Sequence, residues 1–228
     1  ILLCLHRFLR YQIPLSLLPK RMSGQNNEDG RIFDLFFSNR PFRGGFFVEI
    51  GAYDGILFSN SLFFEEYLGW KGLLIEPLPQ AFAQLQKNRP QCLHANSAVS
   101  RLRESVYFLG SDNTAGMPET MSESFRKTWH NEDQTVQRVA AAPISEIIGQ
   151  FDIHRIDLFS IDVEGAELEV LETFDWNIPL WIVLIELDGH NPEKDESCRS
   201  VLRRNGFEWK ADVPGSEIWH HPDHSLPF

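Results

Sequence analysis

Short apolar runs alternate along the chain with segments in which apolar residues recur at helical spacing. The apolar runs are rich in Val, Ile, Leu and Phe, which is typical of strands buried on both faces of a sheet. These predicted strands cover residues 46–50, 72–75, 92–95, 106–109, 136–140, 157–161, 180–187 and 217–220. The helical pattern falls on residues 31–38, 60–67, 80–88, 144–149, 166–174 and 197–205. Strands that alternate with helices predict an α/β fold with a mostly parallel sheet and helices on both faces.

The start of the chain does not follow this alternation. Arginines and a proline interrupt the apolar residues 1–18, so no run reaches the ~20 apolar residues that cross a bilayer. Residues 20–30 are polar and contain glycine, which is typical of a linker. We therefore expect a leader or linker over 1–29, no membrane span, and one domain over 30–228. The chain begins at Ile1, which leaves open whether the leader is a presequence, a linker or part of a longer chain.

Composition and charge exclude some classes of partner. With 21 Lys and Arg against 32 Asp and Glu, the 228 residues carry a formal net charge of −11. A nucleic-acid-binding protein usually has a basic surplus that displaces counterions from phosphates, so we expect no nucleic-acid partner. Cys4, Cys92 and Cys198 have no CxxC spacing, which favours a reducing, cytoplasmic location. The sequence fixes neither the compartment nor the oligomeric state.

A loop with two glycines follows the first predicted strand, at the sheet edge where such folds bind ligands. It reads Glu49-Ile50-Gly51-Ala52-Tyr53-Asp54-Gly55. Gly51 lets the backbone turn and approach a ligand, and Gly55 allows tight passage into the next segment. Glu49 can accept a hydrogen bond from an ammonium group. A loop of this kind is also an ordinary strand-to-helix turn, so by itself it is a weak signal.

A carboxylate ends the second predicted strand. Glu76 follows Gly51 at roughly the 20-residue offset at which an acidic residue binds ribose hydroxyls, which both NAD and S-adenosylmethionine carry. A dinucleotide site uses G-x-G-x-x-G, whose middle glycine is missing here. Glu49 and Asp54 would also place carboxylates where a pyrophosphate should lie. The loop therefore favours S-adenosylmethionine, a sulfonium with an amino-acid tail, over NAD.

Three further segments extend the pattern. They are Ser59-Asn60-Ser61, Gly69-Trp70-Lys71-Gly72-Leu73-Leu74-Ile75-Glu76-Pro77 and Ile161-Asp162-Val163-Glu164-Gly165-Ala166-Glu167. Together with residues 47–55 they resemble the FkbM-type methyltransferases, which are class I, S-adenosylmethionine-dependent enzymes, and the likeness runs from about residue 25 to residue 221. The resemblance implies a Rossmann-like three-layer sandwich with a mostly parallel seven-stranded sheet and one antiparallel strand near the C-terminus. It also implies O-methylation of a hydroxyl, for which we expect a small molecule or a glycan as the acceptor.

The resemblance implies roles for individual residues as well. The expected cofactor-binding residues are Glu49, Gly51, Ala52, Tyr53, Asp54, Gly55, Asn60, Glu76, Pro77, Asn96, Ser97, Ala98 and Asp162. Residues 49–55 would hold the methionine part, Glu76 the ribose, and residues 96–98 would border the adenine. Asp162 would face the methionine amino group or the reacting centre. Many family members carry Lys where this chain has Ser160, so no role of that lysine is expected here.

Polar residues also stand at the ends of two predicted parallel strands, residues 157–161 and 180–187. Asp162 and Glu164 alternate on a strand end, so we expect one of the two to face the ligand. Neighbouring strand ends bring Asp162 near Glu186. We expect the catalytic residues to be Asp162, Glu186 and His190, with His190 as the natural base at neutral pH. In the alternative reading, Glu186 and Asp188 stabilise surface loops and His190 is solvated.

Several alternatives stay open. The same oxygen-rich group suits Mg²⁺ or Mn²⁺, although we expect no metal. His220, His221 and His224 lack zinc-site spacing and are expected in a solvated strand end and tail. Residues 112–116 lie in an irregular loop that is placed to cover an acceptor pocket. Two rival functions are a methyltransferase-like interaction domain without activity and a nicotinamide-dependent oxidoreductase.

Overall fold

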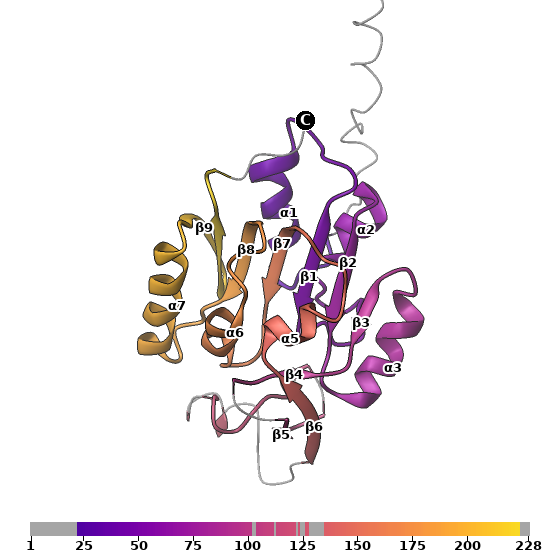
Figure 1. Cartoon of the computed structure of the whole chain (residues 1–228), viewed down its shortest axis with the longest axis vertical. Coiled ribbons are helices and arrows are strands. Elements are labelled where there is room, and N and C mark those ends of the chain that lie inside the picture. The colour runs from indigo at the N-terminus through magenta and orange to yellow at the C-terminus, as the bar shows by residue number, and fades with distance from the viewer. Residues whose placement is uncertain are drawn as a thin grey trace, which may run out of the picture.

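The computed structural model describes residues 22–101, 104–111, 113–121, 123, 126–127 and 135–223. Its main sheet has seven strands in the order β3-β2-β1-β7-β8-β10-β9 (Figure 1). They are β1 (Phe46–Ile50), β2 (Lys71–Ile75), β3 (Leu93–Ala95), β7 (Ile156–Ile161), β8 (Leu180–Glu186), β9 (Glu208–Val213) and β10 (Ser216–His220). Strands β3, β2, β1, β7 and β8 are parallel, and β10 runs antiparallel to both of its neighbours. The predicted sheet, with one antiparallel strand near the C-terminus, is confirmed.

Helices cover both faces of this sheet. They are α1 (Glu28–Ile32), η3 (Phe33–Phe37), α2 (Leu62–Leu68), α3 (Pro79–Asn88), α5 (Ile144–Ile148), α6 (Glu167–Thr173) and α7 (Pro192–Arg204), of which η3 is a π-helix that continues α1. Helices α5, α6 and α7 pack on one face, and α1, η3, α2 and α3 pack on the other. The predicted three-layer α/β sandwich is therefore confirmed.

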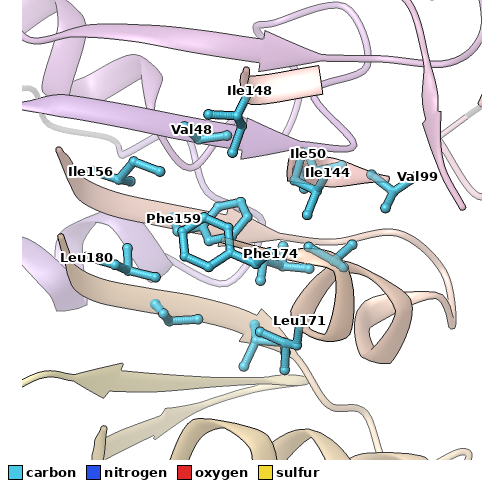
Figure 2. Close-up of a cluster of buried hydrophobic side chains, with 14 of the residues drawn as sticks. Val48, Ile50, Val99, Ile144, Ile148, Ile156, Phe159, Leu171, Phe174 and Leu180 are labelled. Carbon is cyan, nitrogen blue, oxygen red and sulfur yellow. The ribbon is translucent and has the colours of Figure 1, made fainter. Parts of the chain in front are cut away.

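The face under α5, α6 and α7 holds an aliphatic core (Figure 2). Val48 and Ile50 of β1 point to this face because alternate residues of a strand lie on the same side of a sheet. Phe159 of β7 packs against Phe174, with the ring centroids 5.3 Å apart, and Leu171 of α6 joins the same core. This packing fixes the ends of β1 and β7, where the chain continues into polar residues.

The opposite face holds an aromatic cluster. It consists of Phe33, Phe36, Phe37, Phe63, Phe64, Trp70 and Trp181. Phe37 is fully buried and meets Trp70 and Trp181 edge-on, with the ring centroids 5.4 Å apart in both pairs. Edge-to-face pairs add about 0.5–1.5 kcal/mol each to the burial of apolar area. Phe47 of β1 packs into the same cluster, so this face of the sheet is built from large, rigid side chains.

A second sheet, in the order β4-β6-β5, lies at one end of the main sheet (Figure 1). Its strands are β4 (Ala98–Val99), β5 (Ser105–Leu109) and β6 (Val136–Ala142). The sequence pattern did not predict β4 or β9, because β4 has two residues and β9 is a largely exposed edge strand with the polar sequence EWKADV. Helix α7 also begins earlier than predicted, because the Asn191 side chain accepts a hydrogen bond from the Lys194 N–H and caps it.

Residues before α1 contact two distant parts of the chain. Gly24 forms an isolated β-bridge with Phe58. The side-chain amide of Asn26 donates to the carbonyl oxygen of Pro214 at 3.0 Å, in the turn between β9 and β10. Since β10 begins beside the end of β8, these contacts lie at the carboxyl edge of the main sheet. The expected leader lies mostly outside the described residues, within which no helix is long and apolar enough to cross a membrane.

Candidate functional site

A cavity opens at the carboxyl ends of β1, β2, β7 and β8. Its lining includes Glu49, Gly51, Tyr53, Phe58, Asn60, Glu76, Pro77, Ala98, Phe108, Asn113, Ala115, Met117, Ser160, Asp162, Glu164 and Glu186. Five of the described lining residues are Asp or Glu, and none is Lys, Arg or His. A cavity with this lining favours a cationic or hydrogen-bond-donating ligand and opposes a pyrophosphate.

Gly51 brings β1 and β7 together at the base of the cavity. Its φ is +79°, and its N–H donates to the carbonyl oxygen of Ile75 at 3.1 Å. A Cβ at this position would stand 1.9 Å from the carbonyl oxygen of Asp162, so no side chain fits. Gly55 also has a φ of +79°, and a Cβ there would meet side chains of α3. Both glycines therefore have the conformational role that the sequence predicted.

Glu76 presents its carboxylate to the cavity from the end of β2. One oxygen accepts from the N–H of Tyr53 at 2.8 Å and the other from the N–H of Leu78 at 2.7 Å. Burial raises the pKa of Glu76 to about 7, and these two hydrogen bonds oppose the rise. Each oxygen keeps a lone pair for a second donor, so the carboxylate can accept from two neighbouring hydroxyls.

Glu49 is held by its own chain. One carboxylate oxygen accepts from the N–H of Asn60 at 2.8 Å, and the other accepts from the hydroxyls of Ser59 and Ser61. Arg89, buried on α3, donates to both of these hydroxyls. Glu49 therefore shapes the loop that borders the cavity, which differs from the ammonium contact expected from the sequence.

Some of the expected cofactor-binding residues are absent from the cavity wall. They are Ala52, Asp54, Gly55, Asn96 and Ser97. Asp54 accepts from the N–H groups of Ile56 and Leu57, so its carboxylate caps a turn and does not oppose a pyrophosphate. Asn96 donates to the carbonyl oxygens of Glu76 and Pro77. The side chains of Asp54 and Asn96 hold the backbone of residues that line the cavity. A motif match does not separate such supporting residues from the residues that line the wall.

Asp162, Glu164 and Glu186 form an acidic group at the ends of β7 and β8. Burial, followed by the charges of neighbouring carboxylates, raises the pKa of Asp162 to about 7 and that of Glu164 to about 9, and raises the pKa of Glu186 well above its usual value. A hydrogen bond between Asp162 and Glu186 opposes the rise at Asp162. The prediction that one of Asp162 and Glu164 faces the ligand is wrong. The chain turns after Ile161 and Glu164 adopts a φ of +53°, so both line the cavity.

A second chamber adjoins the cavity. Six residues line both spaces: Gln25, Phe58, Asn60, Ser160, Asp162 and Glu186. The outer wall includes Asn26, Glu28 and residues 214–216. Asn60 donates through its side-chain nitrogen to the Ser160 hydroxyl at 3.2 Å, but its side-chain oxygen is buried without a partner. An unpaired buried oxygen lowers the stability of the folded state, and a hydrogen bond from a ligand would offset that loss.

His190 lies outside both spaces. It is exposed, its backbone N–H donates to Asp188, and it lines a small hollow at the rim together with Glu186 and Lys194. The structure thus brings two of the three expected catalytic residues, Asp162 and Glu186, into the cavity and places His190 beside them. Glu186 lines both the cavity and this hollow, whereas His190 lines only the hollow.

Potential metal ligands do not gather in the part of the chain that the structure describes. No group of three His, Cys, Asp or Glu residues there has an arrangement that could hold a metal ion. His220 ends β10, and His221 follows and packs edge-on against Phe207. His224 lies outside the described residues.

Sequence reasoning missed several residues of the cavity wall. Phe108, Met117 and Phe58 line it, but an aromatic residue or methionine in a sequence is by default assigned to the core. Phe58 has a φ of +60°, which is unusual for a large side chain and is held by surrounding contacts. Asn113 and Ala115 also line the cavity, which places the described part of the expected covering loop beside it. No sequence signal marks Phe58, Phe108 or Met117 as cavity residues, whereas the loop that contains Asn113 and Ala115 was expected there.

Comparison with known proteins gives one family match. The family model of the Methyltransferase FkbM domain matches residues 49–209. This range contains the glycine loop, Glu76 and the acidic group at the ends of β7 and β8. A search of curated proteins finds no match.

Solved structures that match this chain include two that are named as methyltransferases and one complex with S-adenosyl-homocysteine. The methyltransferase FkbM from Methylobacillus flagellatus is 14% identical with a TM-score of 0.48, and the match covers 82% of this chain and 46% of that one, so this chain spans about half its length. A putative RNA methyltransferase from Pyrococcus horikoshii is 13% identical with a TM-score of 0.47, covering 98% and 96%. The M. capricolum protein TrmK, in complex with S-adenosyl-homocysteine, is 8% identical with a TM-score of 0.47, covering 88% and 70%.

Proposed function

The chain belongs to the family of FkbM methyltransferase domains, and from this we propose that it is an S-adenosylmethionine-dependent O-methyltransferase of a small molecule or glycan. The observation that carries the proposal is the acidic cavity at the carboxyl ends of β1, β2, β7 and β8. Its position is the one at which open α/β sheets bind ligands.

The residues of this cavity fit the proposed cofactor. Gly51 leaves the backbone accessible where any Cβ would strike Asp162. Glu76 offers free lone pairs to the two ribose hydroxyls. The carboxylates around the cavity suit a sulfonium and an ammonium group, and no described lining residue supplies a positive charge for a phosphate.

The acceptor hydroxyl has to lose its proton during the transfer. When bound, S-adenosylmethionine supplies the methyl group: an oxygen lone pair of the acceptor forms the C–O bond while the C–S bond breaks and leaves its electron pair on sulfur. Asp162 and Glu186 face this region and share a hydrogen bond, so one ionised carboxylate can take the hydroxyl proton. His190, which lines the rim hollow with Glu186, is placed to pass that proton to solvent.

The two rival functions make different demands on the site. A nicotinamide oxidoreductase has to bind a pyrophosphate, which would here face carboxylates without a compensating cation among the described lining residues. An inactive interaction domain does not need an open cavity, yet Gly51 and Glu76 are both in place. Both observations support the methyltransferase proposal over these alternatives.

Calorimetric titration of the purified chain tests the proposal. We expect micromolar binding of S-adenosylmethionine and S-adenosylhomocysteine and no binding of NADH. Glu76→Gln should weaken S-adenosylhomocysteine binding by about 1–3 kcal/mol, the cost of losing a charged hydrogen-bonding partner. The matched control is Glu66→Gln, an exposed glutamate on α2, which should leave the dissociation constant unchanged. Binding of NADH, or failure of both adenosyl compounds to bind, would contradict the proposal.

A further inference from the structure

The second chamber has the position that a methyl acceptor requires. Methyl transfer is an in-line displacement, so the acceptor must reach the cofactor from a space that adjoins the cofactor cavity without being part of it. The chamber shares six lining residues with that cavity, whereas the smaller rim hollow near His190 shares only Glu164 and Glu186. The larger common wall makes the chamber the better entry for an acceptor.

The common wall also contains the groups that the reaction needs. Asp162 and Glu186, the two carboxylates placed to receive a proton, line both spaces. A hydroxyl in the chamber would therefore meet its proton acceptor at the same wall at which it meets the methyl group. Glu164, by contrast, lines the cavity and the rim hollow but not the chamber.

The lining of the chamber defines what kind of molecule it can hold. Carboxylates of Glu28, Asp162 and Glu186 face it, and none of the described residues that line it is Lys, Arg or His. An anionic ligand would have to approach three carboxylates without a compensating cation, which is costly in a partly buried site. A ligand that donates many hydrogen bonds instead finds acceptors on several sides.

Asn60 gives independent evidence that a donor is missing. Its side chain is 8% exposed, lines the chamber, and holds its oxygen buried without any hydrogen-bond partner. The nitrogen of the same amide is already bonded to Ser160, which fixes the orientation of the oxygen. The amide of Asn60 therefore borders the chamber with one hydrogen-bonding position unfilled.

We propose that the second chamber binds the methyl acceptor and that this acceptor is a polyhydroxylated molecule of the carbohydrate class without a negative charge. This inference rests on the proposed function, because it assigns the adjoining cavity to the cofactor. The acceptor's hydroxyls donate to Glu28, to Asn60 and to the carboxylate pair, and one of them is methylated. Residues 25–28 and 214–216 form the outer wall and determine the size of the acceptor.

Blocking variants test the position of the site. Ser216→Trp and Asn26→Trp place a large side chain at the outer wall, and neither residue lines the cofactor cavity. Asn26 is exposed, so we expect Asn26→Trp to fold even if Ser216→Trp does not. Ser197→Trp, on the exposed side of α7, is the matched control. We expect both blocking variants to bind S-adenosylhomocysteine within twofold of the unmodified chain and to lose at least tenfold in acceptor turnover, while Ser197→Trp changes neither.

A panel of acceptors tests the chemistry. Release of S-adenosylhomocysteine is measured with six methyl glycosides (gluco, galacto, manno, fuco, rhamno and xylo forms), with the matching hexuronates, with amino-sugar glycosides and with a short RNA. We expect turnover with at least one uncharged glycoside and at least tenfold less with its uronate and with the RNA. Faster turnover of a uronate or of the RNA overturns the assigned class, as does failure of every glycoside.

The two proposals fail in different ways. If the unmodified chain does not bind S-adenosylhomocysteine, the proposed function fails. If it binds but the blocking variants lose binding along with turnover, the chamber belongs to the cofactor site and the present inference fails. If the blocking variants keep full turnover of a glycoside, the acceptor enters elsewhere, and the inference fails in the same way.

Discussion

Strand β1 connects two regions of opposite character. Phe47 packs into the aromatic cluster, where large rings meet edge-to-face and most side chains are fully buried. Two residues further on, Glu49 borders a cavity lined by carboxylates whose charges oppose one another. The aromatic cluster stabilises the fold. The carboxylates around the cavity lower the free energy of unfolding, and a bound ligand can offset that loss. The difference separates residues that hold the molecule together from those that act.

Phe37→Ala should produce the largest loss of stability. Removing a fully buried ring from the aromatic cluster should lower the free energy of unfolding by about 3–5 kcal/mol, measured by urea denaturation. The dissociation constant of S-adenosylhomocysteine for the folded fraction should stay within about twofold, since the cluster does not reach the cavity. Tyr107→Ala, which removes an aromatic ring that is 59% exposed, should cost less than about 0.5 kcal/mol. Equal costs at the two positions would remove the contrast between the regions.

Gly51→Ala should have the largest effect on binding. The added Cβ would displace the carbonyl oxygen of Asp162, so we expect S-adenosylhomocysteine to bind at least ~100-fold more weakly, about 2.7 kcal/mol by calorimetry. Gly69→Ala is the matched control, because Gly69 also has a positive φ, +64°, but a Cβ there would meet no atom within 4 Å. The control should lose about 1 kcal/mol of stability from backbone strain and keep its affinity. Similar affinity losses in both variants would attribute the effect to strain alone.

Glu164→Gln should stabilise the fold while altering the site. The pKa of Glu164 is raised to about 9, so the folded state binds this proton more tightly than the unfolded chain, whose glutamates titrate near 4.5. The associated stability is present below about pH 4.5 and is lost as the pH rises toward 9. The variant avoids this loss, and we expect a gain on the order of 1–3 kcal/mol at pH 8 that disappears below pH 5. Exposed Glu66→Gln should show no such trend in thermal unfolding, and a pH-independent difference at Glu164 would contradict the assignment.

The pH dependence of cofactor binding should be the smallest of these effects. Because the pKa of Glu76 is raised to about 7, most of this carboxyl group is protonated at pH 6 and accepts fewer hydrogen bonds. We expect S-adenosylhomocysteine to bind several-fold more weakly at pH 6 than at pH 8, by at most about 1.4 kcal/mol. Glu76→Gln should flatten most of this dependence in the same titration. An unchanged slope in that variant would assign the dependence to Asp162, whose pKa is also raised to about 7.

The sequence predicted the main sheet well and the site only in part. Strands β1, β2, β7 and β8 are mostly apolar because both of their faces are covered, so the pattern alone locates them and the polar residues at their ends. Strand β9 has one exposed side and no such run. The glycine loop and Glu76 could be identified because their chemistry is local. Which side chains turn toward the cavity could not, since Asp54 and Asn96 use theirs to hold the backbone.

Glu164 shows the limit of a strand-based prediction. Alternation assigns Asp162 and Glu164 to opposite sides only while the chain stays extended, and here the strand ends at Ile161. A left-handed residue after a strand end has no sequence signature when the residue is glutamate. The chamber was equally beyond prediction, because its wall joins residues 25–28 to residues 214–216.

The hydrogen bond between Asn26 and Pro214 has a consequence for the order in which the molecule assembles. It joins residues 188 positions apart, whereas the strand ends around the cavity lie between Glu49 and Glu186. Long-range closure of this kind is slow compared with local contacts, and during synthesis it has to wait until β10 has left the ribosome. A nascent chain can therefore complete the floor of its first cavity well before the second chamber closes.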